Sequence, residues 1–200
     1  INDKTKVIYL ANPDNPTGTF FTKKVFEEFM KSVPSRVIVL LDEAYFEYAC
    51  HIEDYPDSMH YRYDNVITLR TFSKAQGLAG FKVGHGFADK QLIENLMKVK
   101  VPFEPSSLGQ YAACIAMDDD EHLVNSIKMN NSEKLRLKQF FEDVNLNYIP
   151  SATNFITLEF KSKDIASNFC NSLLKRGVIL RHLISFGLPN CVRITVGLPE

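Results

Sequence analysis

Three short apolar runs, each followed at once by polar residues, constrain the fold of the first half of this chain. The runs Val7–Ala11, Arg36–Leu41 and Val66–Leu69 are typical of strands that are buried on both faces of a parallel sheet. A helix is expected over Lys23–Ser32 with Thr22 as its N-cap, because Thr22 precedes an apolar stripe at helical spacing. Strands that alternate with helices in this way indicate an α/β fold with a mixed, mostly parallel sheet.

A segment with two prolines marks an expected domain boundary near the middle of the chain. Before it, Val83–Ala88 is expected to form one more strand, and Asp89 is expected to cap the next helix. Residues 101–105, Val-Pro-Phe-Glu-Pro, then break the pattern, because proline ends helices and cannot pair inside a sheet. We therefore expect one domain over residues 1–105 and a second over residues 106–200.

The second domain is expected to be a small α+β unit. Its pattern predicts two helices and then a β-α-β-β order, which is typical of a sheet with a helix packed on it. The predicted elements are helices over 107–117 and 121–144, a strand over 154–160, a helix opened by Asp164, and strands over 178–181 and 191–196.

The composition makes several classes of function unexpected. The net charge of −1 favours neither nucleic acid nor a membrane surface as a partner, and no apolar run has the length of a membrane-spanning helix. The cysteines are scattered and the histidines lack ligand spacing. We therefore expect reduced thiols, a cytoplasmic protein and no metal site.

The polar segments that accompany Lys74 in the sequence are not expected for an ordinary surface lysine. It ends the segment Arg70-Thr71-Phe72-Ser73-Lys74, and upstream lie an Asn-Pro loop at residues 12–18 and the pair Asp42 and Tyr45. All of these follow strand ends, where ligands bind in α/β sheets. Pyridoxal phosphate needs such a set: an amine for its aldehyde, a carboxylate for its ring nitrogen, and donors for its ring oxygen and phosphate. We therefore predict that Lys74 binds the aldehyde of pyridoxal 5'-phosphate.

Each of the other polar residues has two interpretations. Asp42 is either a capping carboxylate or the partner that keeps the pyridinium nitrogen protonated. Tyr45 is either a core aromatic or a hydroxyl donor to the phenolic oxygen of the cofactor. Asn15 is either a turn residue or an amide that holds the ring oxygen and a substrate carboxylate.

A phosphate-binding cup is a further interpretation of the segment around Lys74. Thr71, Ser73 and Lys82 supply two hydroxyls and one cation, which suit a phosphate group. The alternative is a polar strand end with a solvated lysine.

Two arginines near the end of the chain are candidates for binding a carboxylate. Arg193 lies inside a run of β-branched residues, so it either reaches solvent from an edge strand or binds a carboxylate as a bidentate fork. Arg181 ends the neighbouring expected strand and is either exposed or directed to the same cleft.

The order of these motifs resembles that in fold-type I aminotransferases, and most closely the histidinol-phosphate aminotransferase subfamily. The resemblance covers essentially the whole chain. It implies part of a large pyridoxal-phosphate-binding domain with three α/β/α layers, followed by a small C-terminal α+β domain, in a homodimer. The segments that carry it are Asn-Pro-Asp-Asn-Pro-Thr-Gly at 12–18, Asp-Glu-Ala-Tyr at 42–45, Leu69 to Gly80, and Val-Arg-Ile-Thr-Val-Gly at 192–197.

The resemblance also implies a role for each candidate residue. Lys74 would carry the cofactor and move the proton of the reaction, Arg193 would bind the α-carboxylate, and Arg181 would bind the substrate at its phosphate. The implied substrates are an amino acid and a keto acid, with an amino group moving between glutamate and imidazole-acetol phosphate in histidine biosynthesis. The implied cofactor contacts are Asp42 at the ring nitrogen, Asn15 and Tyr45 at the ring oxygen, and Thr71, Ser73 and Lys82 at the phosphate.

Two departures from the family pattern affect these expectations. Lys82 stands where the family has an arginine, which keeps the charge but loses the planar fork, so we expect a weaker phosphate contact. Family members are also longer before the segment that matches Ile1, and a strand such as Val7–Ala11 needs partners on both sides. We therefore expect this chain to be the later part of a longer one and, by itself, incompetent as an enzyme.

Three alternatives remain open at the level of sequence. The same scaffold and lysine serve related decarboxylases, and they serve aminotransferases of other amino acids. A non-catalytic fragment that binds pyridoxal phosphate is the alternative from another class.

Overall fold

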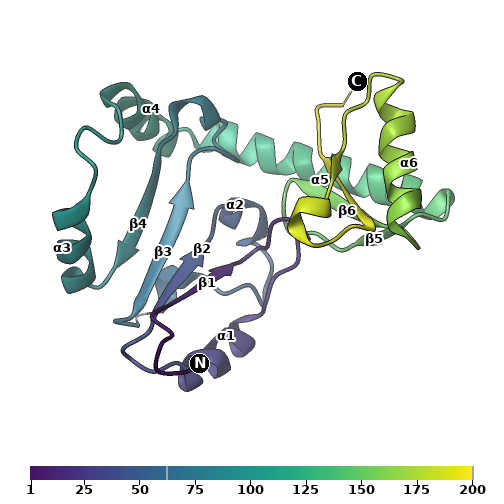
Figure 1. Ribbon diagram of the computed structural model, residues 1–200. Coiled ribbons are helices and arrows are strands. Elements are labelled where there is room, and N and C mark those ends of the chain that lie inside the picture. The colour runs from purple at the N-terminus through teal and green to yellow at the C-terminus, as the bar shows by residue number, and fades with distance from the viewer. Residues whose placement is uncertain (62, 200) are drawn as a thin grey trace. The chain divides into compact units, whose positions relative to one another are not determined.

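The structure, a computed structural model, describes residues 1–61 and 63–199 as two compact units (Figure 1). One unit comprises Ile1–Pro13 with Phe20–Asn125, and the other comprises Asp14–Thr19 with Ser126–Glu200. Compact units of a structure need not coincide with domains, so the predicted domains 1–105 and 106–200 stay a prediction. Residue 200 lies outside the described residues. Each unit is described below by itself.

The first unit is built on a four-stranded sheet. Strands β1 (Val7–Ala11), β2 (Ile38–Asp42) and β3 (Val66–Thr71) pair in parallel, and β4 (Gly84–Ala88) pairs with β3 in the antiparallel direction. The strand order is β1-β2-β3-β4. This confirms the predicted mixed, mostly parallel sheet. Strand β3 extends to Thr71, two residues beyond the predicted end at Leu69.

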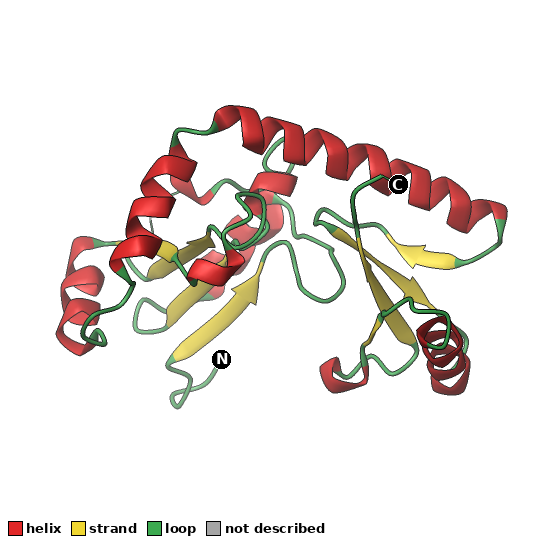
Figure 2. Cartoon of the chain, turned by 90° about the horizontal axis from the view of Figure 1, so that it is seen from above, coloured by secondary structure: helices red, strands yellow, loops and turns green. Residues whose placement is uncertain are grey.

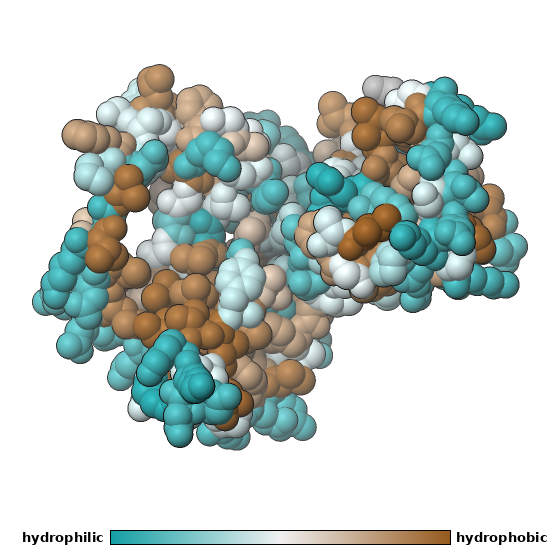
Figure 3. Space-filling model, viewed as in Figure 1, coloured by the Kyte–Doolittle hydropathy of each residue, from teal (hydrophilic) through white to brown (hydrophobic). Residues whose placement is uncertain are grey.

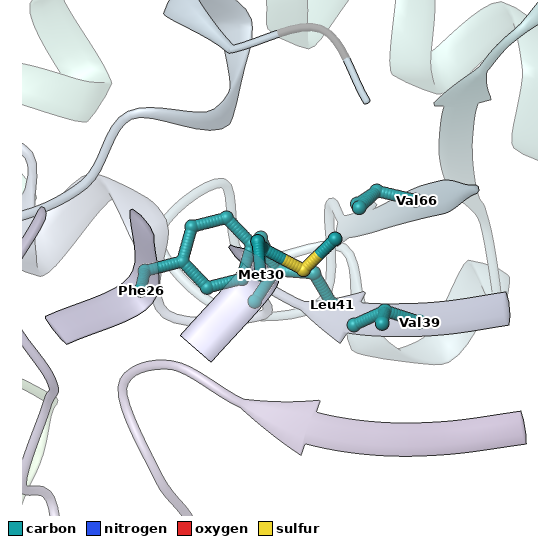
Figure 4. Close-up of a cluster of buried hydrophobic side chains, with 5 residues drawn as sticks. All are labelled: Phe26, Met30, Val39, Leu41 and Val66. Atoms are coloured by element: carbon teal, nitrogen blue, oxygen red, sulfur yellow. The ribbon is translucent and has the colours of Figure 1, made fainter. Parts of the chain in front are cut away.

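Helix α1 (Lys23–Ser32) covers one face of this sheet, as its amphipathic pattern predicts. Thr22 is its N-cap and accepts a hydrogen bond from the Val25 amide, which confirms the prediction. Figure 4 shows the core that results, in which side chains from α1, β2 and β3 point toward one another. These side chains are Phe26, Met30, Val39, Leu41 and Val66.

Shorter helical segments complete the first unit (Figure 2). Asp89 caps α3 (Lys90–Val99) through a hydrogen bond from the Gln91 amide, as predicted. Ala113 of α4 (Ser107–Met117) packs with Phe72 and Val83, which attaches this helix to the segment that follows β3. The remaining segments are α2 (Phe46–Ala49), η1 (Ser58–His60), η2 (Ala79–Phe81) and the start of α5 (Asp120–Asp143).

Apolar side chains lie exposed on the first unit. Val7 and Tyr9 alternate along β1 with Ile8 and Leu10, which pack against the core. Val7 is 51% exposed and Tyr9 is 58% exposed, so their face of the edge strand lacks the cover that α1 provides on the other face. Figure 3 shows apolar side chains gathered over the region of this sheet.

The second unit contains an antiparallel sheet. Its strands, in their order across the sheet, are β5 (Asn147–Ile149), β6 (Phe155–Glu159), β8 (Cys191–Thr195) and β7 (Arg181–His182). Helix α6 (Lys163–Leu174) packs on β7 and β8, and Phe141, Ile156 and Leu158 form a buried cluster. Figure 2 shows α6 beside these strands.

Three sequence expectations for the second unit were wrong in detail. Ser162, not Asp164, caps α6, because its hydroxyl accepts a hydrogen bond from the Ile165 amide. Strand β7 begins at Arg181 rather than near Val178, since only Arg181 and His182 pair with β8. Strand β5 was not predicted, because a three-residue strand leaves no clear alternation.

No helix among the residues described is both long enough and apolar enough to span a membrane. Helix α5 has the length but carries many charged side chains.

Substitution of two glycines with similar backbone angles, Gly18 and Gly177, tests whether the loop at residues 14–19 packs on Ser151. Gly18 has φ +81°, and an added Cβ would lie 2.7 Å from the Cβ of Ser151; Gly177 has φ +84° with nothing within 4 Å. We expect Gly177→Ala to lower the free energy of unfolding by about 1 kcal/mol, from left-handed strain alone. Gly18→Ala should cost about 2–4 kcal/mol, because the steric clash adds to that strain. Urea denaturation measures both, and equal losses would contradict the packing of this loop on Ser151.

Candidate active site

Asp42 is the last residue of β2 and has both carboxylate oxygens engaged by donors. Oδ1 accepts a hydrogen bond of 2.9 Å from the Ala44 amide, and Oδ2 accepts one from the Tyr9 hydroxyl. The Asn12 amide donates to the main-chain carbonyl of Asp42 at 2.9 Å, and this contact closes the end of the β1–β2 pair. The carboxylate is therefore held at the carboxyl edge of the sheet, where the sequence predicted a ligand-binding residue.

Lys74 follows β3 in a tight turn. The Gly77 amide donates to the Lys74 carbonyl at 3.0 Å, and the Leu78 amide donates to the Phe72 carbonyl at 2.8 Å. The half-buried Lys74 side chain places its Nζ 5.3 Å from the centre of the Tyr45 ring, within the range of a cation–π contact. Tyr45 is 6% exposed. The structure thus brings Lys74 and Tyr45 together, as the sequence predicted.

Two of the three residues predicted to bind a phosphate are in contact with each other. The Thr71 hydroxyl donates to Ser73 Oγ at 3.0 Å and accepts from the Ser73 amide at 3.1 Å. Gly84 pairs with Thr71, and an added Cβ on it would lie 2.7 Å from the Arg70 carbonyl, so only glycine allows this close approach of β4. Lys82 has a left-handed backbone (φ 53°), is exposed, and makes no ion pair among the described residues. Its role at a phosphate stays a prediction.

A buried ion cluster that the sequence analysis missed connects the ends of β2 and β3. Arg70 Nε and Nη2 lie 2.9 and 2.8 Å from Glu43 Oε2, and Nη2 also lies 3.2 Å from Asp57 Oδ1. The guanidinium stacks over Phe46, with Cζ 3.3 Å from the ring centre. Glu43 adjoins Asp42 and Arg70 adjoins Thr71, so the cluster holds both site-bearing strand ends. The only sign of this cluster in the sequence was that a charged residue, Glu43 or Arg70, lies at the end of each of the two apolar runs.

Burial raises the pKa of Glu43, and the adjacent Arg70 guanidinium opposes that rise. The Glu43 side chain is 0% exposed, so its carboxylate is removed from water. An acid with a raised pKa in the fold contributes stability below its unfolded pKa and loses that contribution as the pH rises through its folded pKa.

We expect Arg70→Met to lower the free energy of unfolding by about 3–5 kcal/mol at pH 7, because it leaves the buried Glu43 carboxylate without its cation. The loss should be smaller at pH 5, where Glu43 can take up a proton. Thermal and urea unfolding at both pH values measure the effect.

The matched control is the double variant Arg70→Met/Glu43→Gln, which carries no buried charge at residue 43. It should be more stable than Arg70→Met at pH 7 and should show less dependence on pH. Equal stability of the single and double variants at pH 7 would contradict the ion-pair explanation.

In the second unit, Arg193 and Arg181 lie directly opposite each other on β8 and β7. Directly opposed residues of antiparallel strands point to the same face of the sheet, and the expectation that this face borders a substrate cleft stays a prediction. Arg193 is half-buried, with its Cζ 4.9 Å from the Phe155 ring centre and its Nε without a hydrogen-bond partner among the described residues. Arg181 is exposed.

The loop that carries Asn15 rests on the same face of this sheet. Arg193 Nη1 donates to Asn15 Oδ1, and the buried Thr157 hydroxyl donates to the Pro16 carbonyl at 2.6 Å. Thr157 is the β6 neighbour of Arg193. Asn15 and Arg193, predicted to share a substrate carboxylate, are therefore in contact with each other. Thr157 was missed because a threonine in a strand is ordinary.

A cavity of about 690 Å³ in the first unit is lined by apolar residues such as Phe72, Val83 and Met117, and its lining does not include Asp42 or Lys74. Among the described residues no three histidine, cysteine or acidic side chains converge to hold a metal ion. The predicted absence of a metal stays a prediction.

The donor set of the first unit fits pyridoxal phosphate. Lys74 supplies an amine, and Asp42 supplies a carboxylate that can accept about two hydrogen bonds beyond the two it has. Tyr45 supplies a phenol beside the amine, and Thr71 and Ser73 supply paired hydroxyls. These are the groups that an aldehyde, a pyridinium nitrogen, a phenolic oxygen and a phosphate require.

The chain belongs to the aminotransferase class I and II family, because a sequence model of that family matches residues 1–200. Among curated proteins it is 44% identical to histidinol-phosphate aminotransferase 2 of Carboxydothermus hydrogenoformans and 42% identical to that of Pseudomonas fluorescens. The matches cover 100% of this chain but 55% and 54% of those relatives. The chain therefore spans about half the length of the curated relatives it matches.

A solved structure shows the same similarity. The histidinol-phosphate aminotransferase from Sinorhizobium meliloti, in complex with pyridoxal-5'-phosphate, matches with a TM-score of 0.87 and 30% identity. The match covers 96% of this chain and 53% of that one. The predicted α/β fold class and the predicted family are both confirmed.

Proposed function

We propose that this chain is the lysine-bearing part of a pyridoxal-phosphate-dependent aminotransferase of histidine biosynthesis. The reaction proposed transfers the amino group of histidinol phosphate to 2-oxoglutarate and yields imidazole-acetol phosphate and glutamate. Family membership and the names of the relatives support the reaction. The observation that carries the proposal is the placement of Lys74 over the Tyr45 ring, next to the strand that ends at Asp42.

Pyridoxal phosphate, when bound, supplies an aldehyde for the amino group and a ring that withdraws electrons from the reacting carbon. In the proposal, the Lys74 Nζ holds the cofactor and afterwards moves a proton. Asp42 keeps a proton on the ring nitrogen, and Tyr45 and Asn15 donate to the ring oxygen. Thr71, Ser73 and Lys82 bind the phosphate.

The substrate is proposed to be held by the arginines of the second unit. A guanidinium binds a carboxylate through two parallel hydrogen bonds, and Arg193 has N–H groups beyond the Nη1 that donates to Asn15. Glutamate and 2-oxoglutarate carry that carboxylate. Only histidinol phosphate and its product carry a phosphate, which we assign to Arg181. By analogy with the family, we also propose a cytoplasmic homodimer.

The first test measures covalent cofactor binding. The 200-residue chain, and a version extended by the part of the Carboxydothermus relative that it does not cover, are titrated with pyridoxal phosphate. We expect a visible absorbance band, from attachment at Lys74, in the extended protein and a weak or absent band in the chain alone. Lys74→Ala should abolish the band, and Lys161→Ala, at an exposed position, should leave it unchanged. If no Lys74-dependent band forms in either protein, the proposed function is wrong.

The second test separates the two arginines by substrate. Arg193→Ala should lower kcat/KM about 10–100-fold mainly for glutamate, because it removes a charged hydrogen-bond partner of the α-carboxylate, which histidinol phosphate does not carry. Arg181→Ala should lower kcat/KM mainly for histidinol phosphate. Steady-state assays of each half-reaction measure both values.

Two results would contradict the assignment. Equal losses for both substrates in Arg181→Ala would remove the phosphate role from that residue. Release of carbon dioxide without any keto acid would replace the transaminase with the related decarboxylase.

A further inference from the structure

The hydroxyl of Tyr9 reaches from β1 to the carboxylate of Asp42. In the parallel register Ala11 stands opposite Asp42, so Tyr9 lies two residues before that position and on the same face. A tyrosine side chain is long enough to span this diagonal. We propose that Tyr9 is a positioning residue, which fixes the Asp42 carboxylate for the ring nitrogen of the cofactor. The inference rests on the proposed function.

The two oxygens of Asp42 have different donors from different elements. The Ala44 amide, just after β2, holds Oδ1, and the Tyr9 hydroxyl on β1 holds Oδ2. One donor alone would allow the carboxylate to rotate about its Cβ–Cγ bond, whereas two donors fix its plane. A carboxylate accepts about four hydrogen bonds, so an acceptor site remains for a ring N–H.

Within the part of the chain that the structure describes, burial does not explain a tyrosine at this position. Tyr9 is 58% exposed, and Val7, on the same face of the same strand, is 51% exposed without any polar group. Ile8 and Leu10 supply the contacts of β1 with the core from its other face. The hydroxyl is thus what distinguishes Tyr9 from its neighbours, and Asp42 receives its hydrogen bond.

Tyr9→Phe removes this hydroxyl and keeps the ring. We expect the dissociation constant of pyridoxal phosphate to rise roughly three- to tenfold, since one hydrogen bond to a charged group is lost. The visible band changes its wavelength when the lysine nitrogen takes up a proton, and the pH at which this happens should also rise. A loosely held Asp42 keeps less positive charge on the ring nitrogen, and that charge opposes protonation of the nearby lysine nitrogen. Tyr111→Phe makes the same chemical change at an exposed position and should alter neither value.

A double-mutant cycle shows whether Tyr9 acts through Asp42. Tyr9→Phe, Asp42→Asn and the double variant are titrated with pyridoxal phosphate in the protein form that shows the Lys74-dependent band. The effect of Tyr9→Phe should disappear in the Asp42→Asn background. If Asp42→Asn binds too weakly to titrate, a cofactor analogue with carbon in place of the ring nitrogen is used instead. Tyr9→Phe should then leave the affinity of that analogue unchanged.

Each outcome decides the proposal. Unchanged affinity and band in Tyr9→Phe, with a normal band in the parent protein, would overturn the role of Tyr9 and leave the proposed function standing. An effect of the same size in the Asp42→Asn background, or with the analogue, would show that Tyr9 does not act through Asp42. Absence of any Lys74-dependent band in the parent would remove the proposed function and this inference together.

Discussion

The parallel pairing of β1, β2 and β3 is the constraint on which the candidate site depends. Parallel strands in register end at the same edge of a sheet, so residues distant in the sequence meet there. Asp42 pairs with Leu69, which places the segment Thr71–Lys74 just beyond the end of β2. A shift of one residue would turn Asp42 to the opposite face, away from Tyr9 and toward the α1 core. The apolar contacts of Val39 and Leu41 with α1 oppose such a shift.

A buried charge cluster reinforces that edge at a cost in desolvation. Glu43 and Arg70 give up water to pair with each other, and burial raises the pKa of Glu43 despite the adjacent guanidinium. A pair of apolar residues in place of Glu43 and Arg70 would stabilise the fold equally well. The cluster is therefore better explained by the two strand ends that it connects. It ties the residue after Asp42 to the residue before Thr71. In the second unit an uncharged hydrogen bond holds a candidate site residue in place. The Thr157 hydroxyl donates to the Pro16 carbonyl, and this contact holds the loop that carries Asn15 beside Arg193.

Strong local patterns were predicted well from the sequence, and contacts between distant residues were not. The bounds of β1, α1 and α4 agree with the predictions, because each has a clear apolar run or stripe. The contacts of Lys74 with Tyr45 and of Asn15 with Arg193 agree with the predicted groupings. Tyr9, Glu43, Arg70 and Thr157 were missed as partners of the site. Each acts through strand register, which a single sequence does not show.

By itself, the sequence determined the α/β pattern and the family, and it supplied candidate residues for an amine-reactive, phosphate-bearing cofactor, whose roles stay predictions. These follow from residue types and their spacing, which are local properties. Only the tertiary structure decided that Tyr9 donates to Asp42 and that Arg70 pairs with Glu43. It also decided that Arg181 and Arg193 share one face of a sheet. Hydrogen bonds and ion pairs depend on separations of a few ångströms, and these are fixed only when the strands are packed in one register.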